Sequence, residues 1–194
     1  MQKVKQRSNN EYVQIILKEI NFVLSQIDEY QVELLLKQIL KAKTIVLCGA
    51  GRVGMAARGF AMRLGHLGLK AYMLGDSTVP ALKKGDLFIV CSGSGETQTI
   101  YDLVIESKKS NAHVALISSY IDHNKSRMAK IADTVVVINA PSKIKMIEKF
   151  SSIQPMTTLN EQCLAIFFDA IVLRLMDELH ETHDTMWARH SKLE

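Results

Sequence analysis

The stretch Phe88-Ile-Val-Cys-Ser-Gly-Ser-Gly-Glu-Thr97 predicts a β-strand that ends in a loop of small, polar residues. Apolar residues with helical spacing follow at 100–105. The first N–H groups of such a helix have no partner within the helix, and the helix dipole is positive there, so this point favours an anion. An ordinary turn with Ser94 as the N-cap gives a similar pattern. Because the glycines allow close approach of the backbone, we favour a phosphate site formed by Ser92, Gly93, Ser94, Gly95, Glu96 and Thr97.

Strand and helix patterns alternate on both sides of this stretch, which favours an α/β fold with a parallel sheet covered on both faces, a three-layer αβα sandwich. Predicted strands lie at 44–48, 70–74, 86–91, 113–117 and 134–138. The intervening helices are predicted at 53–67, 97–110 and 125–131. We expect one domain over residues 1–194, with N-terminal helices at 8–42, a sheet core at 44–138 and C-terminal helices at 156–190. A capping box formed by Ser8 and Glu11 opens the first helix.

Composition limits the class of protein. An apolar fraction of 47% in 194 residues is enough for a full core. The net charge of +4 comes from scattered lysines, so we expect no nucleic-acid partner. No apolar stretch follows Met1, and the longest apolar run, 163–176, is short and charged, so we expect neither a secretory signal nor a membrane span. Three cysteines without metal-like spacing favour reduced thiols in a cytoplasmic protein.

A second glycine loop, Gly49-Ala-Gly-Arg-Val-Gly54, has the G-x-G-x-x-G spacing of a dinucleotide site. Asp76, just past the next predicted strand, is then the candidate ribose ligand. Arg52 argues instead for a sugar phosphate or carboxylate. In a sheet with the flavodoxin-like order 2-1-3-4-5, this loop and the 92–97 loop line one crevice at the topological switch point. A phosphosugar fits that crevice better than a dinucleotide.

Several sequence blocks in matching order resemble one family. The 92–97 loop on a five-stranded parallel sheet looks like the sugar isomerase (SIS) domain, and from about residue 45 onward the chain resembles 6-phospho-3-hexuloisomerases. The blocks are Gly49-Ala-Gly-Arg52, Phe60-Ala-Met-Arg-Leu64, His66-Leu-Gly68, Ser92–Thr97, Gln154-Pro-Met156, Phe168-Asp-Ala-Ile171, Ala188-Arg-His190 and Leu193-Glu194.

The resemblance implies an isomerase that interconverts arabino-hex-3-ulose 6-phosphate and fructose 6-phosphate in the ribulose monophosphate pathway. Such an enzyme acts on a phosphorylated ketohexose, without metal or organic cofactor, and is usually a tetramer with active sites near subunit contacts. The reaction needs a base to move a proton between C2 and C3 through a 2,3-enediol. The resemblance places that base at Glu161. The pattern Thr158-Leu-Asn-Glu161 is also that of a capping box, in which Glu161 would only satisfy the helix N-terminus.

Other residues of the family blocks and loops are further candidates. His66 is a candidate for polarising the carbonyl or moving a proton between the enediol oxygens. Arg52 is a candidate ligand of the phosphate or the enediolate. The side chain of Glu96 should point away from a bound phosphate and favour the helix dipole. Arg189 and His190 either reach a neighbouring subunit's site or help assembly.

Two departures from the family pattern affect the expected substrate. Val53 stands where the first loop of the family commonly has serine, and Asn160 replaces an aromatic residue before the base. An isomerase of another sugar phosphate and a sugar-phosphate-binding regulator without catalysis therefore remain open. A nicotinamide-dependent oxidoreductase is the least favoured reading. We expect a homo-oligomer, a tetramer or a dimer, because the apolar surface of the 156–179 helix is broad for an edge helix.

Overall fold

The sheet has the predicted topology. The computed structural model describes residues 7–119, 126–141 and 151–192. Every neighbouring pair of strands is parallel and the strand order is β2-β1-β3-β4-β5, so the expected order 2-1-3-4-5 is confirmed. The strands are β1 (Ile45–Gly49), β2 (Ala71–Met73), β3 (Leu87–Cys91), β4 (His113–Ser118) and β5 (Thr134–Val137).

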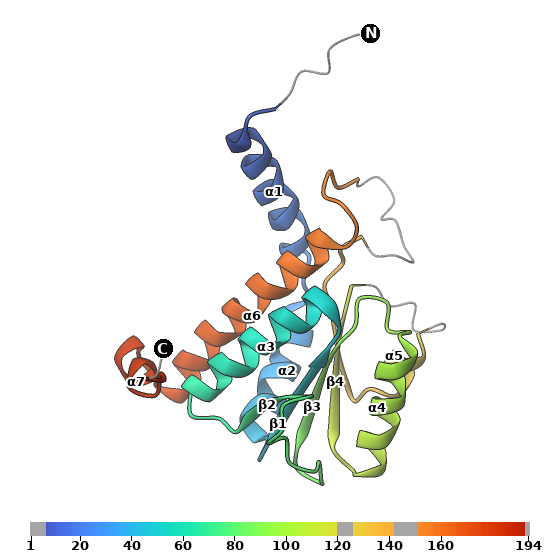
Figure 1. Ribbon diagram of the computed structural model, residues 1–194, viewed down its shortest axis with the longest axis vertical. Coiled ribbons are helices and arrows are strands. Elements are labelled where there is room, and N and C mark those ends of the chain that lie inside the picture. The colour runs from blue at the N-terminus through green and yellow to red at the C-terminus, as the bar shows by residue number, and fades with distance from the viewer. Residues whose placement is uncertain (1–6, 120–125, 142–150, 193–194) are drawn as a thin grey trace.

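Helices cover both faces of this sheet, as Figure 1 shows, which confirms the three-layer arrangement. The predicted helix bounds agree within about three residues, although Lys125, the first residue of one predicted helix, lies outside the described residues, as do Leu193 and Glu194 of the shared tail. The helices are α1 (Asn9–Leu24), α2 (Glu29–Lys41), α3 (Gly51–His66), α4 (Gln98–Lys109), α5 (Arg127–Ile131), α6 (Thr158–Leu179) and α7 (His183–Ala188).

Alternating strand residues divide the core into two layers. In β3, Leu87 and Ile89 face α1, α2, α3 and α6, whereas Phe88 and Val90 face α4 and α5. Side chains on both faces are buried, so the strand reads as a continuous apolar run rather than an alternating one. This burial explains why the short runs of valine, isoleucine and leucine in the sequence predict the strands well.

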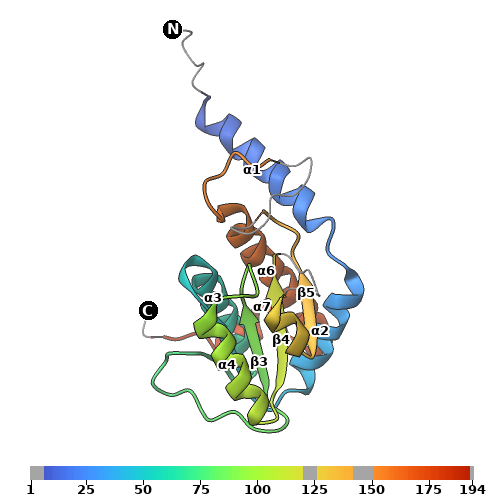
Figure 2. The same ribbon diagram turned by 90° about the vertical axis from the view of Figure 1, so that its right-hand side faces the viewer.

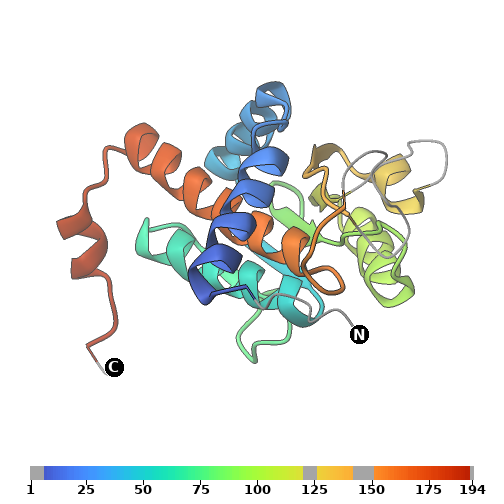
Figure 3. The same ribbon diagram turned by 90° about the horizontal axis from the view of Figure 1, so that it is seen from above.

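The two N-terminal helices have well-formed ends. Ser8 caps α1, with Oγ accepting from the Glu11 N–H at 3.2 Å and the Ser8 N–H donating to Glu11 Oε2 at 2.7 Å, so the predicted capping box is confirmed. Figure 3 shows α1 crossing over α6.

Among the described residues, no helix combines the length and the apolar character needed to cross a membrane.

The three cysteines, Cys48, Cys91 and Cys163, are buried free thiols. Burial raises the pKa of Cys48 to about 11 and that of Cys163 to about 12, and it also raises the pKa of Cys91. A thiol with a pKa near 11 is ionised to about one part in a thousand at pH 8. We therefore expect Ellman's reagent at pH 8 to modify all three thiols only after unfolding in guanidinium. Rapid modification of one thiol in the folded protein would contradict this assignment.

Candidate functional site

A pocket of about 470 Å³ lies where the chain leaves β1 and β3. The first residues of α3 and α6 form one wall, and the loop after β3 forms the other. In Figure 1, α3 and α6 lie side by side and both run away from this edge of the sheet. The two glycine loops therefore line one crevice, as predicted from the strand order.

The helices that meet at the pocket differ from the others at their N-termini. Side-chain oxygens of Ser8, Asp28, Ser126 and Thr182 accept hydrogen bonds from backbone N–H groups at the starts of α1, α2, α5 and α7. In the described part of the chain, the N-cap residues of α3, α4 and α6, which are Ala50, Thr97 and Thr157, make no such bond. All three line the pocket. Their helices thus direct positive dipole ends and first-turn N–H groups toward one space, an arrangement suited to an anion.

Glu161 lies in this pocket, in the first turn of α6. Its side chain is 14% exposed, and its carboxylate accepts a 2.8 Å hydrogen bond from Thr157 Oγ1. Arg52 Nε, from the first turn of α3, lies 3.2 Å from Glu161 Oε2. The helix begins one residue earlier than a capping box at Thr158 requires, with Thr157 as N-cap. The capping reading of Glu161 is therefore wrong, and its carboxylate is turned toward the pocket wall formed by Arg52.

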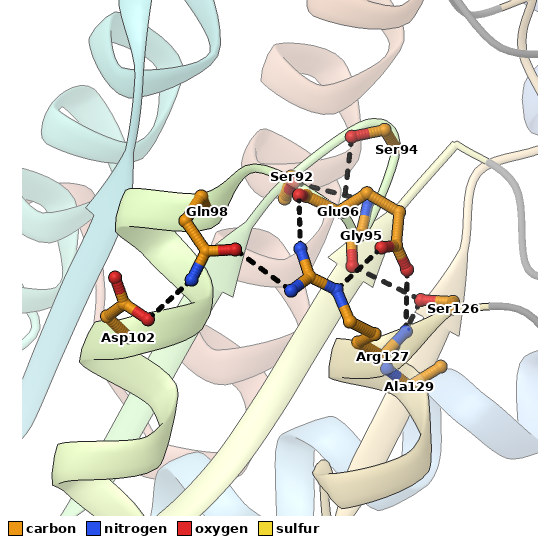
Figure 4. Close-up of polar contacts among 9 residues, drawn as sticks. All are labelled: Ser92, Ser94, Gly95, Glu96, Gln98, Asp102, Ser126, Arg127 and Ala129. Atoms are coloured by element: carbon orange, nitrogen blue, oxygen red, sulfur yellow. Dashed lines mark hydrogen bonds and ion pairs between the residues drawn. The ribbon is translucent and has the colours of Figure 1, made fainter.

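The loop after β3 keeps its shape through its own serines. Ser92 Oγ accepts from the Gly95 N–H and Ser94 Oγ from the Glu96 N–H, each at 3.2 Å. Gly95 has a φ of +65°, and a Cβ at that position would lie 2.4 Å from Ser126 Oγ. Ser94 thus stabilises the turn but does not cap α4, whose N-cap is Thr97. Figure 4 shows these contacts.

Of the predicted loop residues, Ser92, Gly93, Ser94 and Thr97 line the pocket. Glu96 points elsewhere, as expected: its carboxylate accepts from the Arg127 N–H at 2.6 Å and from Arg127 Nε at 2.9 Å (Figure 4). Burial alone would raise the pKa of Glu96, but the hydrogen bonds and charge of Arg127 lower it below its ordinary value. The helix N-terminus that Glu96 meets is that of α5, not that of α4.

His66 does not join Glu161 within one chain. It is the last residue of α3, so the helical rise places it about 21 Å along the axis from Arg52, which lies in the first turn. Its ring lies 5.2 Å from the His190 ring, and its carbonyl oxygen accepts from Arg189 Nη1 at 3.0 Å. Within one chain, His66 therefore lies far from Glu161, in a cluster with the C-terminal tail, and its catalytic role stays a prediction.

Thr157 and Asn160 also line the pocket, although neither was among the candidate site residues. Thr157 orients Glu161, and the buried side chain of Asn160 lies close to Gly93, where a Cβ would stand 3.2 Å from Asn160 Nδ2. Both follow the Gln154-Pro-Met156 block. The family resemblance therefore pointed to this part of the sequence, but it could not predict the contacts that the two side chains make. Asp76, the candidate ribose ligand, is paired with Arg58 at 2.7 Å. Among the described residues, no three His, Cys, Asp or Glu side chains are grouped so that they could hold a metal ion.

Comparison with known proteins gives the family of this chain. Residues 38–166 match the SIS domain family. The 3-hexulose-6-phosphate isomerase of Bacillus subtilis is 35% identical over 95% of this chain and 98% of its own length. The enzyme of the same name from Mycobacterium gastri is 34% identical over 93% of this chain and 88% of its own. A Methanococcus jannaschii protein, whose crystal structure was taken to infer the same function, superimposes with a TM-score of 0.81 at 30% identity, over 95% of this chain and 99% of that one.

Proposed function

Since the chain belongs to the SIS domain family and is similar over nearly its whole length to 3-hexulose-6-phosphate isomerases, we propose that it interconverts arabino-hex-3-ulose 6-phosphate and fructose 6-phosphate. The observation that carries the proposal is the convergence of three helix N-termini without side-chain caps, beside a carboxylate, on one pocket. The N-termini suit a phosphate, and the carboxylate suits proton transfer at a carbon next to a carbonyl.

In the proposed mechanism, Ser92, Ser94, Thr97 and the backbone N–H groups around Gly93 bind the phosphate, while Gly95 holds the turn. Glu161 removes the proton from C2 of the 3-ketose, which leaves a 2,3-enediolate; a proton then moves from the C2 hydroxyl to the C3 oxygen, and Glu161 returns its proton to C3 to form the 2-ketose. Arg52 forms an ion pair with Glu161, and its guanidinium lies near enough to stabilise negative charge on the enediolate oxygens. Its side chain is 57% exposed, so it is free to move toward a ligand.

We also propose that the chain assembles as a homotetramer or homodimer, in the cytoplasm, and serves the ribulose monophosphate pathway. Large apolar side chains remain exposed on α1, α3 and α6, among them Leu17 (52%), Met55 (72%) and Leu173 (63%). Apolar side chains at this density favour contact with a second copy. Light scattering on the purified protein measures the number of subunits.

NMR of fructose 6-phosphate incubated with the protein in D₂O tests the proposed reaction. We expect deuterium at C3 and new hexulose signals, because enediol formation removes the C3 proton of the 2-ketose. Label at C1 would indicate aldose–ketose chemistry and would overturn the proposed substrate pair. Binding without exchange or product would favour a sugar-phosphate-binding regulator. Fluorescence titration with NADH tests the oxidoreductase reading, for which we expect no saturable signal.

A further inference from the structure

The N-terminal helix α1 holds the segment that leads into the pocket. Glu19 of α1 is 7% exposed, and its carboxylate accepts three hydrogen bonds from residues more than 130 positions away in the sequence. The donors are Ser152 Oγ at 2.7 Å, the Ile153 N–H at 2.8 Å and Gln154 Nε2 at 2.9 Å. Figure 2 shows α1 beside the chain that enters α6.

The three donors bring the segment 152–154 around one carboxylate. Ser152 Oγ also accepts from the Gln154 N–H at 3.0 Å, which closes the turn. A carboxylate has only acceptor sites, about four of them, so three converging donors are satisfied without rearrangement. An amide side chain at the same position has one acceptor oxygen, which can keep the two bonds made by Oε2, and presents its NH2 donors to the Ile153 N–H.

The residues that follow this turn form the wall of the pocket. Met156 has a φ of +56°, a left-handed conformation that a side-chain-bearing residue keeps only when its surroundings hold it there. Thr157 follows, and its hydroxyl donates to Glu161. The chain of contacts therefore runs from Glu19 through 152–157 to the carboxylate that faces the pocket.

We propose that Glu19 is a positioning residue for the isomerisation: by fixing residues 152–157 it holds Thr157, and through it Glu161, in the reactive geometry. This inference rests on the proposed function of the pocket. Glu19 does not touch the substrate. Through Glu19, the position of α1 affects the geometry of the active site, although α1 contributes no residue to the pocket itself.

A matched control lies elsewhere on the N-terminal helices. Arg174, in the last third of α6, forms ion pairs with Glu29 and Glu33 of α2. These contacts also tie an N-terminal helix to α6, but they lie far along the helix from Glu161. The Glu33→Ala variant thus removes an ion pair between an N-terminal helix and α6 without disturbing the segment 152–157, and its kcat shows what such a loss costs by itself.

Kinetics on fructose 6-phosphate test the inference. For Glu19→Ala we expect kcat to fall about tenfold to a hundredfold, with KM changed by less than about threefold, because the base is misplaced while the phosphate loop is intact. Glu19→Gln should lie between Glu19→Ala and the unmodified protein, and Glu33→Ala should keep its kcat. A Glu19→Ala kcat equal to that of the unmodified protein, or a loss matched by Glu33→Ala, overturns the proposal.

Amide hydrogen exchange provides a readout that does not depend on turnover. In Glu19→Ala, the peptide that spans 151–158 should exchange about tenfold faster, since the Ile153 N–H has lost its acceptor, while the 92–97 loop should be unchanged. Unchanged exchange at 151–158 overturns the proposal even if the variant is impaired. If the unmodified protein does not isomerise fructose 6-phosphate, the proposed function fails, and faster exchange still shows that Glu19 holds the segment. The Ser152→Ala variant removes one of the three donors to Glu19 and should increase the exchange rate of the 151–158 peptide by less than Glu19→Ala does.

Discussion

Replacing Glu161 by glutamine is expected to lower kcat for fructose 6-phosphate isomerisation by about a thousandfold, with little change in KM. Glutamine has nearly the same shape and still accepts a hydrogen bond from Thr157, but it cannot take up a proton from carbon. General acid–base catalysis by a positioned side chain contributes about a hundredfold to ten-thousandfold, and here one group transfers the proton in both directions. Coupled assay of the 3-ketose formed, together with C3 deuterium exchange, measures the loss.

The control for this variant is Glu178→Gln, which makes the same chemical change on the exposed surface at the other end of α6. It should retain full activity. Glu161→Gln should still bind fructose 6-phosphate in a thermal-shift titration, because the phosphate loop is untouched. Wild-type exchange at C3 in Glu161→Gln would exclude Glu161 as the base.

The Glu161→Gln substitution also changes the ion pair between Glu161 and Arg52. Its Nε is 3.2 Å from Glu161 Oε2, and Nη1 is 3.5 Å from Thr158 Oγ1. Loss of the carboxylate charge therefore also frees the guanidinium. If Arg52 stabilises the enediolate, Arg52→Ala lowers kcat with little change in KM, whereas a role of Arg52 in phosphate binding raises KM. The KM of the two variants separates these effects.

The fold could be predicted from the sequence because each strand and helix has its own local pattern of apolar residues. Each strand is a short apolar run buried on both faces, and the helices between them have clear periodicity, so the order of elements could be read directly. The position of the 92–97 loop at the end of a strand could also be predicted, and Ser92, Gly93, Ser94 and Thr97 line the pocket, whereas phosphate binding there stays a prediction. Glu161 came from the family resemblance, and the structure added the contacts with Thr157 and Arg52 that orient it.

The parts that could not be predicted depend on contacts between distant residues. Glu19 and Ser152 are 133 positions apart. The spacing from Ile16 and Val23 puts Glu19 on the apolar face of α1, but it does not identify the partners of its carboxylate. Thr158-Leu-Asn-Glu161 has the spacing of a capping box, but the helix starts with Thr157 as N-cap, and Arg52 takes the carboxylate. The distance between His66 and Arg52 could not be predicted either, because it is set by the full length of α3.

The Gly54→Ala substitution is expected to destabilise the protein by about 2–3 kcal/mol, the usual cost of overpacking a tight contact. A Cβ on Gly54 would lie 2.4 Å from the Gly49 carbonyl oxygen and 3.0 Å from its carbon. These are backbone atoms at the end of β1, so no side-chain rotation relieves the contact, and α3 must move away from the sheet. For a chain of 194 residues, this loss corresponds to a fall in Tm of about 5–10 °C.

The same substitution five residues further along α3 provides the control. Gly59 is exposed, and an added Cβ would meet no atom within 4 Å. Because alanine is the better helix former, Gly59→Ala should raise stability by up to about 1 kcal/mol. Thermal unfolding at one protein concentration compares the two variants. Opposite signs would show that the third glycine of the G-x-G-x-x-G loop serves helix–strand contact, which does not require a dinucleotide; equal shifts would contradict the packing argument. Since Arg52 lies in the turn that Gly54 displaces, Gly54→Ala should also reduce kcat in the folded protein.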